Sequence, residues 1–199
     1  MTASWLRRDE PLPLSITVRA GTALVRQGEP CHVAWLVRSG ALWESIVLAD
    51  GRELAIDVLG PDGLVGEPAG APAASSVRTL GVTRLMPVDP DRAAGLFAAR
   101  ARRTAALAAE LAWSDVPSRL RTRLRELAGR FGLPVPGGTA IGLRLTQDQL
   151  AQLCGSTRET VNRALRLLVI GDEVRLAGPG RYVVVDRAPV PTIEERTPP

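Results

Sequence analysis

Lysine is absent from this chain of 199 residues, and all 25 of its basic residues are arginine. Cysteine occurs only at Cys31 and Cys154, and the single histidine is His32. Two distant cysteines form neither a disulfide framework nor the set of about four ligands that an iron–sulfur cluster needs. One histidine cannot supply the several ligands of a metal oxygenase, and every nucleophile–histidine–acid set would depend on it. We therefore expect no catalytic residue, no metal site and no cofactor.

Long apolar runs are also missing. No segment of 18 residues is apolar throughout, so we expect no transmembrane helix. The first residues, MTASWLRRDEPLPL, lack the apolar core of a signal peptide. These two absences predict a cytoplasmic protein that does not insert into a membrane.

The basic charge is concentrated in the second half of the chain. Residues 1–115 hold 12 arginines and 13 acidic residues, whereas residues 116–187 hold 12 arginines and 6 acidic residues. Uneven charge of this kind is typical of a domain that binds a polyanion. Arginine suits phosphate and guanine recognition better than lysine does, although a GC-rich coding sequence would produce the same preference.

Residues 15–88 have the pattern of a small antiparallel β domain, preceded by an N-terminal arm of residues 1–14. Segments rich in branched and aromatic residues alternate with turn residues such as Asp50-Gly51, which is a strong hairpin signal. The expected strands are ITV, TALV, VAWLV, ALWESIVL, LAID and VTRLMPV. Many short strands at close spacing favour a barrel or a sandwich.

A long helix is expected over residues 89–115. Asp89, Pro90 and Asp91 offer an N-cap, a proline at the first helical position and an acid in the first turn. A set of mostly small residues then recurs at alternating steps of four and three, the spacing of a coiled-coil seam: Phe97, Ala101, Thr104, Ala108 and Leu111. The same spacing fits an amphipathic helix packed on its own domain, and the pattern alone does not separate the two.

Residues 116–187 predict a set of short elements. A helix over 117–131 carries a leucine stripe, GLPVPGG at 132–138 is expected to be a loop, and residues 139–145 are expected to be a strand. Thr146 and Gln149 fit a capping box for a short helix that ends at Cys154-Gly155, and Ser156 or Thr157 can cap the next helix. Residues 174–186 predict a hairpin, and the proline-rich residues 188–199 predict a disordered tail.

The helix expected over residues 156–169 has one polar face and one apolar face. With Arg158 at zero, about 100° per residue places Asn162 near 40°, Arg166 near 80°, Glu159 near 100° and Arg163 near 140°. Two short helices joined by a tight glycine turn form a helix-turn-helix, whose second helix reads base edges in the major groove. Arginine can donate two bonds to guanine, and glutamate can accept from cytosine. Glu159 therefore fits base reading, although it could also close a capping box with Ser156.

The stretch TQDQLAQLCGSTRETVNRALRLL, residues 146–168, resembles the helix-turn-helix signature of the Crp/Fnr family of transcription regulators. Ala151, Gly155 and Val161 stand at the small, turn and core positions of that motif. The resemblance implies that Arg158, Glu159 and Arg163 read a GTGA-type half-site. Auxiliary or phosphate contacts are expected from Thr146, Thr157, Thr160, Asn162 and Arg166. The hairpin at 174–186 would be the wing of a winged helix.

The resemblance extends upstream through the glycine turns of residues 20–67, which are similar to those of the family's cyclic-nucleotide-binding β-roll. It implies an α+β architecture: a β-roll over 15–88, a dimerisation helix over 89–115 and a winged helix-turn-helix over 116–187. In this architecture the seam of residues 97–111 joins two copies of the chain, so a homodimer is expected.

The sequence differs from the family pattern in the segment that would bind cyclic AMP. Family members that bind cyclic AMP follow Gly-Glu with an Arg-Ser or Arg-Thr pair that holds the cyclic phosphate. Here the arginine position falls near Ala73 and Ala74, which cannot pair with a phosphate. The resemblance leaves a candidate ligand pocket at Gly66, Glu67, Ser75, Ser76 and Arg78. A haem sensor would have only Cys31 or His32 as ligand, and a lone cysteine or histidine in a β domain is usually structural.

The sequence thus predicts a homodimeric regulator that binds double-stranded DNA at a palindromic GTGA-type site without cyclic AMP. The alternative within the same family is a regulator that an unidentified effector switches through the β-roll. RNA polymerase is a candidate partner. One alternative is an enzyme built on a cupin-like barrel, and the single histidine argues against it. Another is a ligand-binding module whose helix-turn-helix binds protein, and the polar face of Arg158, Glu159 and Arg163 argues against that.

Overall fold

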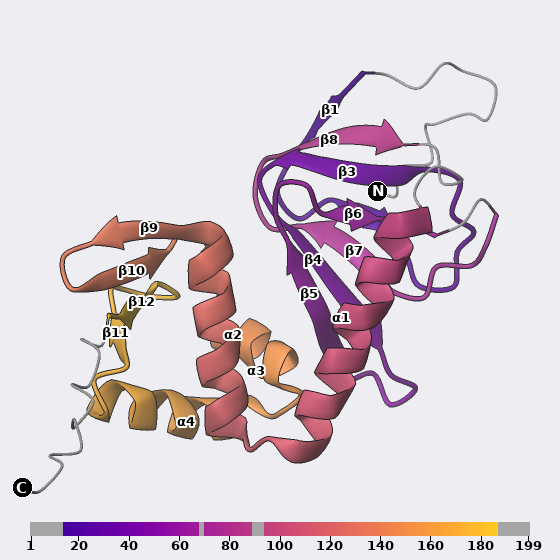
Figure 1. Ribbon diagram of the computed structural model, residues 1–199. Helices are drawn as coiled ribbons and strands as arrows, with labels where there is room; N and C mark the ends of the chain where they lie inside the picture. Colours follow the sequence, from indigo (N-terminus) through magenta and orange to yellow (C-terminus); the bar gives the residue numbers. More distant parts are fainter. Residues whose placement is uncertain (1–13, 68–69, 89–93, 187–199) are drawn as a thin grey trace, which may run out of the picture.

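A computed structural model describes residues 14–67, 70–88 and 94–186 of the chain (Figure 1). Within the first turns of its first helix, the side chains of residues 94–97 and 99 are not described. The N-terminal arm up to residue 13, the predicted helix cap at residues 89–91 and the tail at residues 188–199 lie outside the described residues. Those three expectations remain predictions.

The N-terminal domain consists of two four-stranded antiparallel sheets that face each other. One sheet has the order β1-β8-β3-β6 and the other has the order β2-β7-β4-β5. The strands are β1 Ile16–Val18, β2 Ala23–Val25, β3 Ala34–Ser39, β4 Leu42–Val47, β5 Glu53–Leu59, β6 Leu64–Val65, β7 Ser76–Thr79 and β8 Thr83–Val88. Side chains from both sheets, including Trp35, Leu42 and Leu85, form the core between them. The expected β domain is therefore confirmed as a β-roll.

The turns differ in what they connect. Asp50-Gly51 joins β4 to β5 as the expected hairpin, with Gly51 at a φ of 82°. Ser39-Gly40 instead takes the chain from one sheet to the other, because β3 and β4 do not pair. A Cβ on Gly40 would lie 2.6 Å from the Val82 carbonyl oxygen, so this corner requires glycine. β6 and β7 were not predicted, since β6 has only two residues and β7 is largely polar.

α1 spans Ala94–Trp113 and connects the β-roll to α2, Val116–Phe131, which is the first helix of the C-terminal domain. Asp115 caps α2 by accepting a hydrogen bond from the Ser118 backbone N–H, and Pro117 lies in the first turn as predicted. α1 lies along the β-roll, and α2 then runs back in roughly the opposite direction to α1 (Figure 1).

The C-terminal domain packs three helices against a small sheet of order β11-β12-β10-β9. Its elements after α2 are β9 Gly132–Val135, β10 Gly138–Ile141, α3 Gln147–Cys154, α4 Arg158–Ile170, β11 Val174–Leu176 and β12 Tyr182–Val185. The prediction of a loop at 132–138 was wrong, because residues 132–135 pair with β10 as an edge strand. An edge strand tolerates Pro134, which cannot donate a backbone hydrogen bond.

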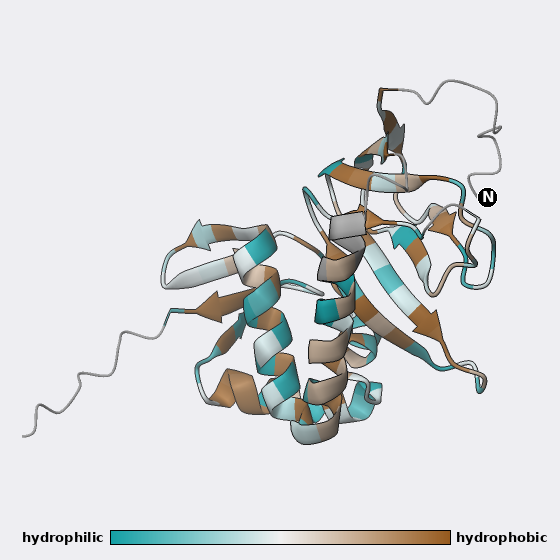
Figure 2. Cartoon of the chain, turned by 45° about the vertical axis from the view of Figure 1, so that its right-hand side comes forward, coloured by the Kyte–Doolittle hydropathy of each residue, from teal (hydrophilic) through white to brown (hydrophobic). Residues whose placement is uncertain are grey.

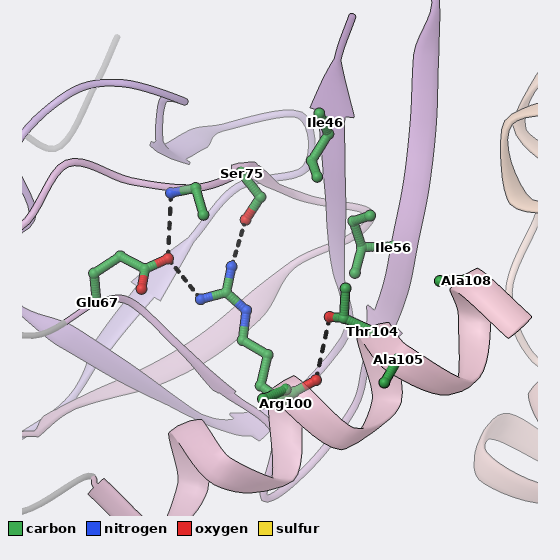
Figure 3. A pocket seen from close by; sticks show the side chains of 10 residues that line it. Ile46, Ile56, Glu67, Ser75, Arg100, Thr104, Ala105 and Ala108 are labelled. Carbon is green, nitrogen blue, oxygen red and sulfur yellow. Dashed lines mark hydrogen bonds and ion pairs between the residues drawn. The ribbon is translucent and has the colours of Figure 1, made fainter.

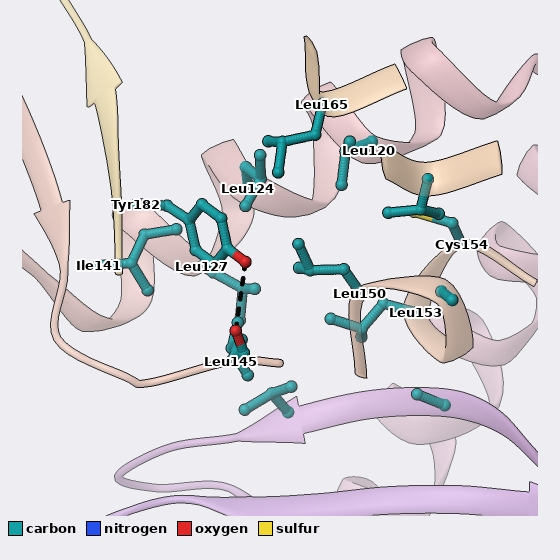
Figure 4. Packing of buried hydrophobic residues seen from close by; sticks show 14 of the residues in the cluster. Leu120, Leu124, Leu127, Ile141, Leu145, Leu150, Leu153, Cys154, Leu165 and Tyr182 are labelled. Atoms are coloured by element: carbon teal, nitrogen blue, oxygen red, sulfur yellow. Dashed lines mark hydrogen bonds between the residues drawn. The ribbon is translucent and has the colours of Figure 1, made fainter. Parts of the chain in front are cut away.

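The core of this domain is continuous with one face of the β-roll (Figure 4). Leucines of α2, α3 and α4 pack with Tyr182, whose hydroxyl donates to the Leu145 carbonyl at 3.3 Å. Trp43 and Ala55 of the β-roll belong to the same cluster. α3 therefore lies directly on the β4–β5 sheet, and the two domains share buried surface. Within the described residues, no helix is both long and apolar enough to cross a bilayer.

Candidate nucleic-acid interface

The turn between α3 and α4 is fixed by three local features. Thr146 and Gln149 form the predicted capping box at the start of α3. Gly155 ends α3 in the left-handed conformation at a φ of 55°, and a Cβ there would lie 2.8 Å from Leu111 of α1. Thr157 then caps α4 by accepting from the Thr160 backbone N–H. This arrangement is a helix-turn-helix in which the start of α4 is held against α3.

Thr157, and not Ser156, is the N-cap of α4. A capping box needs its acidic partner three residues after the cap, and Glu159 lies only two residues after Thr157. The capping role considered for Glu159 is therefore excluded, which leaves its exposed carboxylate free to act outside the helix. Thr146 and Thr157 already use their hydroxyl oxygens as caps, and the Thr157 and Thr160 hydroxyls lie 2.9 Å apart.

The two faces of α4 separate as the helical geometry predicts. Val161, Ala164, Leu165 and Leu168 are buried in the domain core. Arg158, Glu159, Arg163 and Arg166 are exposed on the other side of the helix, and the apolar residues Leu167, Val169 and Ile170 are exposed near its C-terminal end. A helix that offers three guanidinium groups and one carboxylate to solvent carries the donor and acceptor groups that base edges and phosphates require.

Asn162 lies differently from its neighbours on this face. It is half-buried and its side-chain nitrogen donates to Gln147 Oε1 of α3 at 2.9 Å. Arg158 Nε donates to the same oxygen at 3.3 Å. No local pattern in the sequence indicates Gln147, because its role depends on how α3 crosses α4.

Two arginines beside α4, Arg144 before α3 and Arg181 on the wing, were not among the residues that the sequence pattern predicted. Arg144, Arg158 and the tip residues Gly178–Gly180 line a hollow of about 500 Å³ between the wing and the start of α4. Arg181 is exposed beside this tip, and Arg144 is exposed shortly before α3. In the sequence, Arg181 directly follows the Gly-Pro-Gly turn and Arg144 shortly precedes the capping box of α3. These two positions could have indicated that both arginines lie near the recognition helix. Together with α4 they make this surface basic.

A second site lies between α1 and the β-roll (Figure 3), where the guanidinium of Arg100 is enclosed by acceptors. Its Nη2 contacts Glu44 Oε1 at 2.5 Å and donates to Ser75 Oγ at 2.8 Å. Its Nη1 donates to Glu67 Oε1 at 2.7 Å and to the Gly66 carbonyl at 3.0 Å. Ser75 Oγ in turn donates to Glu44 Oε1 at 2.6 Å. The network ties α1 to β4 and to the segment between β6 and β7.

The charges in this network compensate one another. Glu44 is only 1% exposed, so its charge requires a partner. Burial alone would lower the pKa of Arg100, but Glu44 and Glu67 together raise it. Arg100 therefore stays charged and neutralises part of the acidic site.

The candidate pocket residues divide between two places. Gly66, Glu67 and Ser75 meet at Arg100, whereas Ser76 and Arg78 line a separate hollow over β2 and β7. Ser76 accepts from the Gln27 backbone N–H, and the Arg78 guanidinium lies over Trp43 at 5.3 Å from the ring centre. Ser76 and Arg78 thus lie apart from the other three residues, because Ser75 and Ser76 face opposite sides of the sheet.

Two family models match the chain. One, described as a Crp-like helix-turn-helix domain, matches residues 118–188, and the other, a cyclic nucleotide-binding domain, matches residues 15–100. A CRP-like cAMP-activated global transcriptional regulator of Mycobacterium tuberculosis is 32% identical over 175 residues, which is 79% of this chain and 78% of that protein. The chain belongs to the Crp/Fnr family.

Other Crp/Fnr proteins agree in sequence and in fold. The cAMP-activated global transcriptional regulator CRP of Escherichia coli is 27% identical over 183 residues, covering 82% of this chain and 85% of that protein. A CRP/FNR-family transcriptional regulator from Thermus thermophilus superposes with a TM-score of 0.75 at 24% identity, covering 86% of this chain and 93% of that one. FixK2 from Bradyrhizobium japonicum gives a TM-score of 0.75 at 22% identity, with coverages of 87% and 92%.

These matches make the protein a Crp/Fnr-type transcriptional regulator with a helix-turn-helix DNA-binding domain and a cyclic-nucleotide-binding-type domain. DNA is therefore a partner of this chain.

The expected seam of this Crp/Fnr chain lies along one side of α1. Ala101, Thr104 and Ala108 are exposed and border the hollow beside Arg100. Leu111 is half-buried beside Gly155, and the side chain of Phe97 is not described. Leu107 is buried, although the seam pattern omitted it.

Both cysteines of the regulator are buried thiols. Burial raises the pKa of Cys154 to about 12, so this thiol stays protonated at neutral pH. Burial, followed by the charge of Glu67, also raises the pKa of Cys31. Within the described residues, no cluster of three or more histidine, cysteine or acidic side chains is placed to hold a metal ion.

Proposed function

We propose that this regulator acts as a homodimer on a palindromic DNA site with GTGA-type half-sites, and that it does so without cyclic AMP. The observation that carries this proposal is the exposed face of Arg158, Glu159 and Arg163 on a helix whose opposite face is buried. Arg158 and Arg163 pair with guanines and Glu159 accepts from cytosine. Thr157, Thr160 and Arg166 are the auxiliary or phosphate contacts, with Thr146 at the start of α3.

Exposed alanines along α1 support the dimer. Ala101, Ala105, Ala108 and Ala112 are exposed, and Trp113 is 90% exposed at the end of the helix. Figure 2 shows α1 as a pale brown helix interrupted by hydrophilic bands, in keeping with its alanines and arginines. An exposed helix side of small apolar residues allows close packing against a second copy. Paired α1 helices would place two α4 helices at successive major grooves, about 34 Å apart.

The charge of the Arg100 site supports activity without cyclic AMP. A cyclic phosphate entering there would meet the buried carboxylate of Glu44 and that of Glu67, and the guanidinium of Arg100 already pairs with both. Ala73 and Ala74 offer no replacement cation. An anion would therefore incur a desolvation penalty without an ionic partner of its own.

The second candidate is a regulator that responds to another small ligand. A hollow of about 460 Å³ remains beside Arg100, lined mainly by Ile46, Ile56 and the alanines of α1. A hollow of this size accommodates a small molecule with an apolar body. RNA polymerase is the further partner that such a regulator would contact on DNA, and no enzymatic activity is proposed.

Replacing a base-reading arginine tests the assignment of α4. Arg163→Ala should reduce the preference for the palindrome over a scrambled duplex by about 10-fold to 100-fold, because one bidentate contact to guanine is lost. Fluorescence anisotropy at fixed salt measures both affinities. Arg102→Ala, an exposed arginine of α1, is the matched control and should leave the preference unchanged. An unchanged preference in Arg163→Ala would contradict base reading by this residue.

A further inference from the structure

Gln147, the first residue of α3, joins two residues of the recognition helix through one oxygen. Its Oε1 accepts from Asn162 Nδ2 at 2.9 Å and from Arg158 Nε at 3.3 Å. An amide oxygen has two lone pairs, and both are engaged here. The Gln147 amide is therefore fixed in orientation, with its oxygen toward α4.

This contact determines which edge of the Arg158 guanidinium is available. Arginine can offer guanine either its two terminal nitrogens or Nε together with one terminal nitrogen, because its five N–H groups form a rigid planar fork. Nε of Arg158 is turned toward Gln147, which leaves the terminal Nη1 and Nη2 edge. Asp148 lies 3.9 Å from Nη1, beyond hydrogen-bonding distance, and both side chains are largely exposed.

Asn162 is oriented toward α3 instead of toward the groove. It is half-buried, and its Oδ1 is buried without a hydrogen-bond partner among the described residues. A side chain held in this way is poorly placed to reach a phosphate or a base. It is well placed to hold Gln147, since it supplies the shorter of the two bonds to Oε1.

We infer that Gln147 is a positioning residue that holds Nε of Arg158 so that its two terminal nitrogens read guanine end-on, with Asn162 bracing Gln147 and making no DNA contact itself. The inference rests on the proposed function, because it assigns a role through the base contact of Arg158. Holding a flexible arginine before DNA arrives reduces the ordering cost of binding. Loss of the Gln147 side chain is therefore expected to reduce base discrimination at the one base pair that Arg158 reads.

The test measures binding of the wild-type protein and variants to the palindrome and to duplexes changed symmetrically at each half-site position. Arg158→Ala first identifies the base pair that Arg158 reads. Gln147→Ala should reduce discrimination at that base pair about fivefold to tenfold and leave the other positions within about twofold, as expected for partial loss of one bidentate contact. Asn162→Ala should act at the same base pair in the same direction. Arg102→Ala, an exposed arginine of α1, is the control and should not change base discrimination there.

The double variant Gln147→Ala/Arg158→Ala separates positioning from direct contact. If Gln147 acts through Arg158, adding Gln147→Ala to Arg158→Ala changes discrimination by less than about twofold, because interacting residues are non-additive. A full additional loss would overturn the inference and show that Gln147 contacts DNA itself. Unchanged discrimination in both Gln147→Ala and Gln147→Leu would also overturn it, and using both variants guards against a folding defect in either. If the wild-type protein shows no base preference at any position, the proposed function fails before this inference is reached.

Discussion

At the scale of single residues, the burial of Glu44 explains why Arg100 occupies its site. Glu44 and Asp57 lie opposite each other on β4 and β5, and both are buried. Each is paired with an arginine of α1, Glu44 with Arg100 and Asp57 with Arg103, three residues further along. One side of α1 thus supplies positive charge to both buried acids, and Arg130 of α2 adds a second ionic partner for Asp57.

Arg100→Ala should lower the free energy of unfolding by about 3 kcal/mol, because Glu44 would remain buried without its ionic partner. Urea unfolding followed by circular dichroism measures the change. Arg102→Ala, exposed on the same helix, should stay within about 0.5 kcal/mol of the wild-type protein. A loss below about 1 kcal/mol for Arg100→Ala would show that the network is not structural.

Cys154 should make the protein less stable in alkali. Its pKa is about 12 in the folded protein against a usual value of 9.0, so the unfolded chain releases the thiol proton first. The stabilisation is complete below about pH 9 and is lost as pH rises toward about 12. Between about pH 8 and pH 10 the expected loss from this group is about 1.4 kcal/mol. Urea titrations should show a shallower pH dependence for Cys154→Ala, and equal slopes would contradict the assignment.

At the scale of elements, the sequence predicted helices better than strands. α2, α3 and α4 follow from leucine spacing, capping residues and Gly155, which are local signals. β9 was missed because Pro134 is typical of a loop, although an edge strand tolerates it. β6 and β7 were missed because their partners are distant strands and their own residues are few or polar. The Arg100 network was missed for the same reason, since Glu44 and Glu67 lie 56 and 33 residues away in the sequence.

The same limit applies to the site residues. Helical spacing placed Arg158, Glu159, Arg163 and Arg166 on one exposed face, as observed. It also placed Asn162 there, although this residue is turned toward Gln147. Helical spacing gives the angular position of a residue around its own helix, but it does not show which side chains of a neighbouring helix lie within reach. The hydrogen bond to Gln147 of α3 turns Asn162 away from the exposed face.

The exposed side of α1 should carry the dimer interface. Ala105→Arg would place a charged side chain where a second α1 packs closely, so we expect a monomer with at least about 10-fold weaker binding to the palindrome. Sedimentation velocity measures the oligomeric state, with Arg102→Ala as the control. A monomeric wild-type protein, or a dimer that persists in Ala105→Arg, would contradict this interface.

At the scale of the whole molecule, the β-roll and the DNA-binding domain are joined by more than the connecting helix α1. Asp57 Oδ1 accepts from Arg130 of α2 at 2.7 Å, and Gln152 of α3 donates to Glu53 of β5 at 2.8 Å. A Cβ on Gly60 would lie 2.7 Å from the Phe131 ring, so the domains also touch closely at that point. The helix-turn-helix is thus held on the β4–β5 sheet while the outer face of α4 stays exposed. This arrangement fits a regulator that needs no effector to present its recognition helix.

The most direct measurement is a fluorescence anisotropy titration at controlled salt of a TGTGA-N6-TCACA palindrome and of a scrambled duplex, each with and without cyclic AMP. The account predicts selective binding to the palindrome in the absence of cyclic AMP and the same affinity in its presence. Selective binding that appears only with cyclic AMP would contradict it, because the Arg100 site would then have to accept the cyclic phosphate.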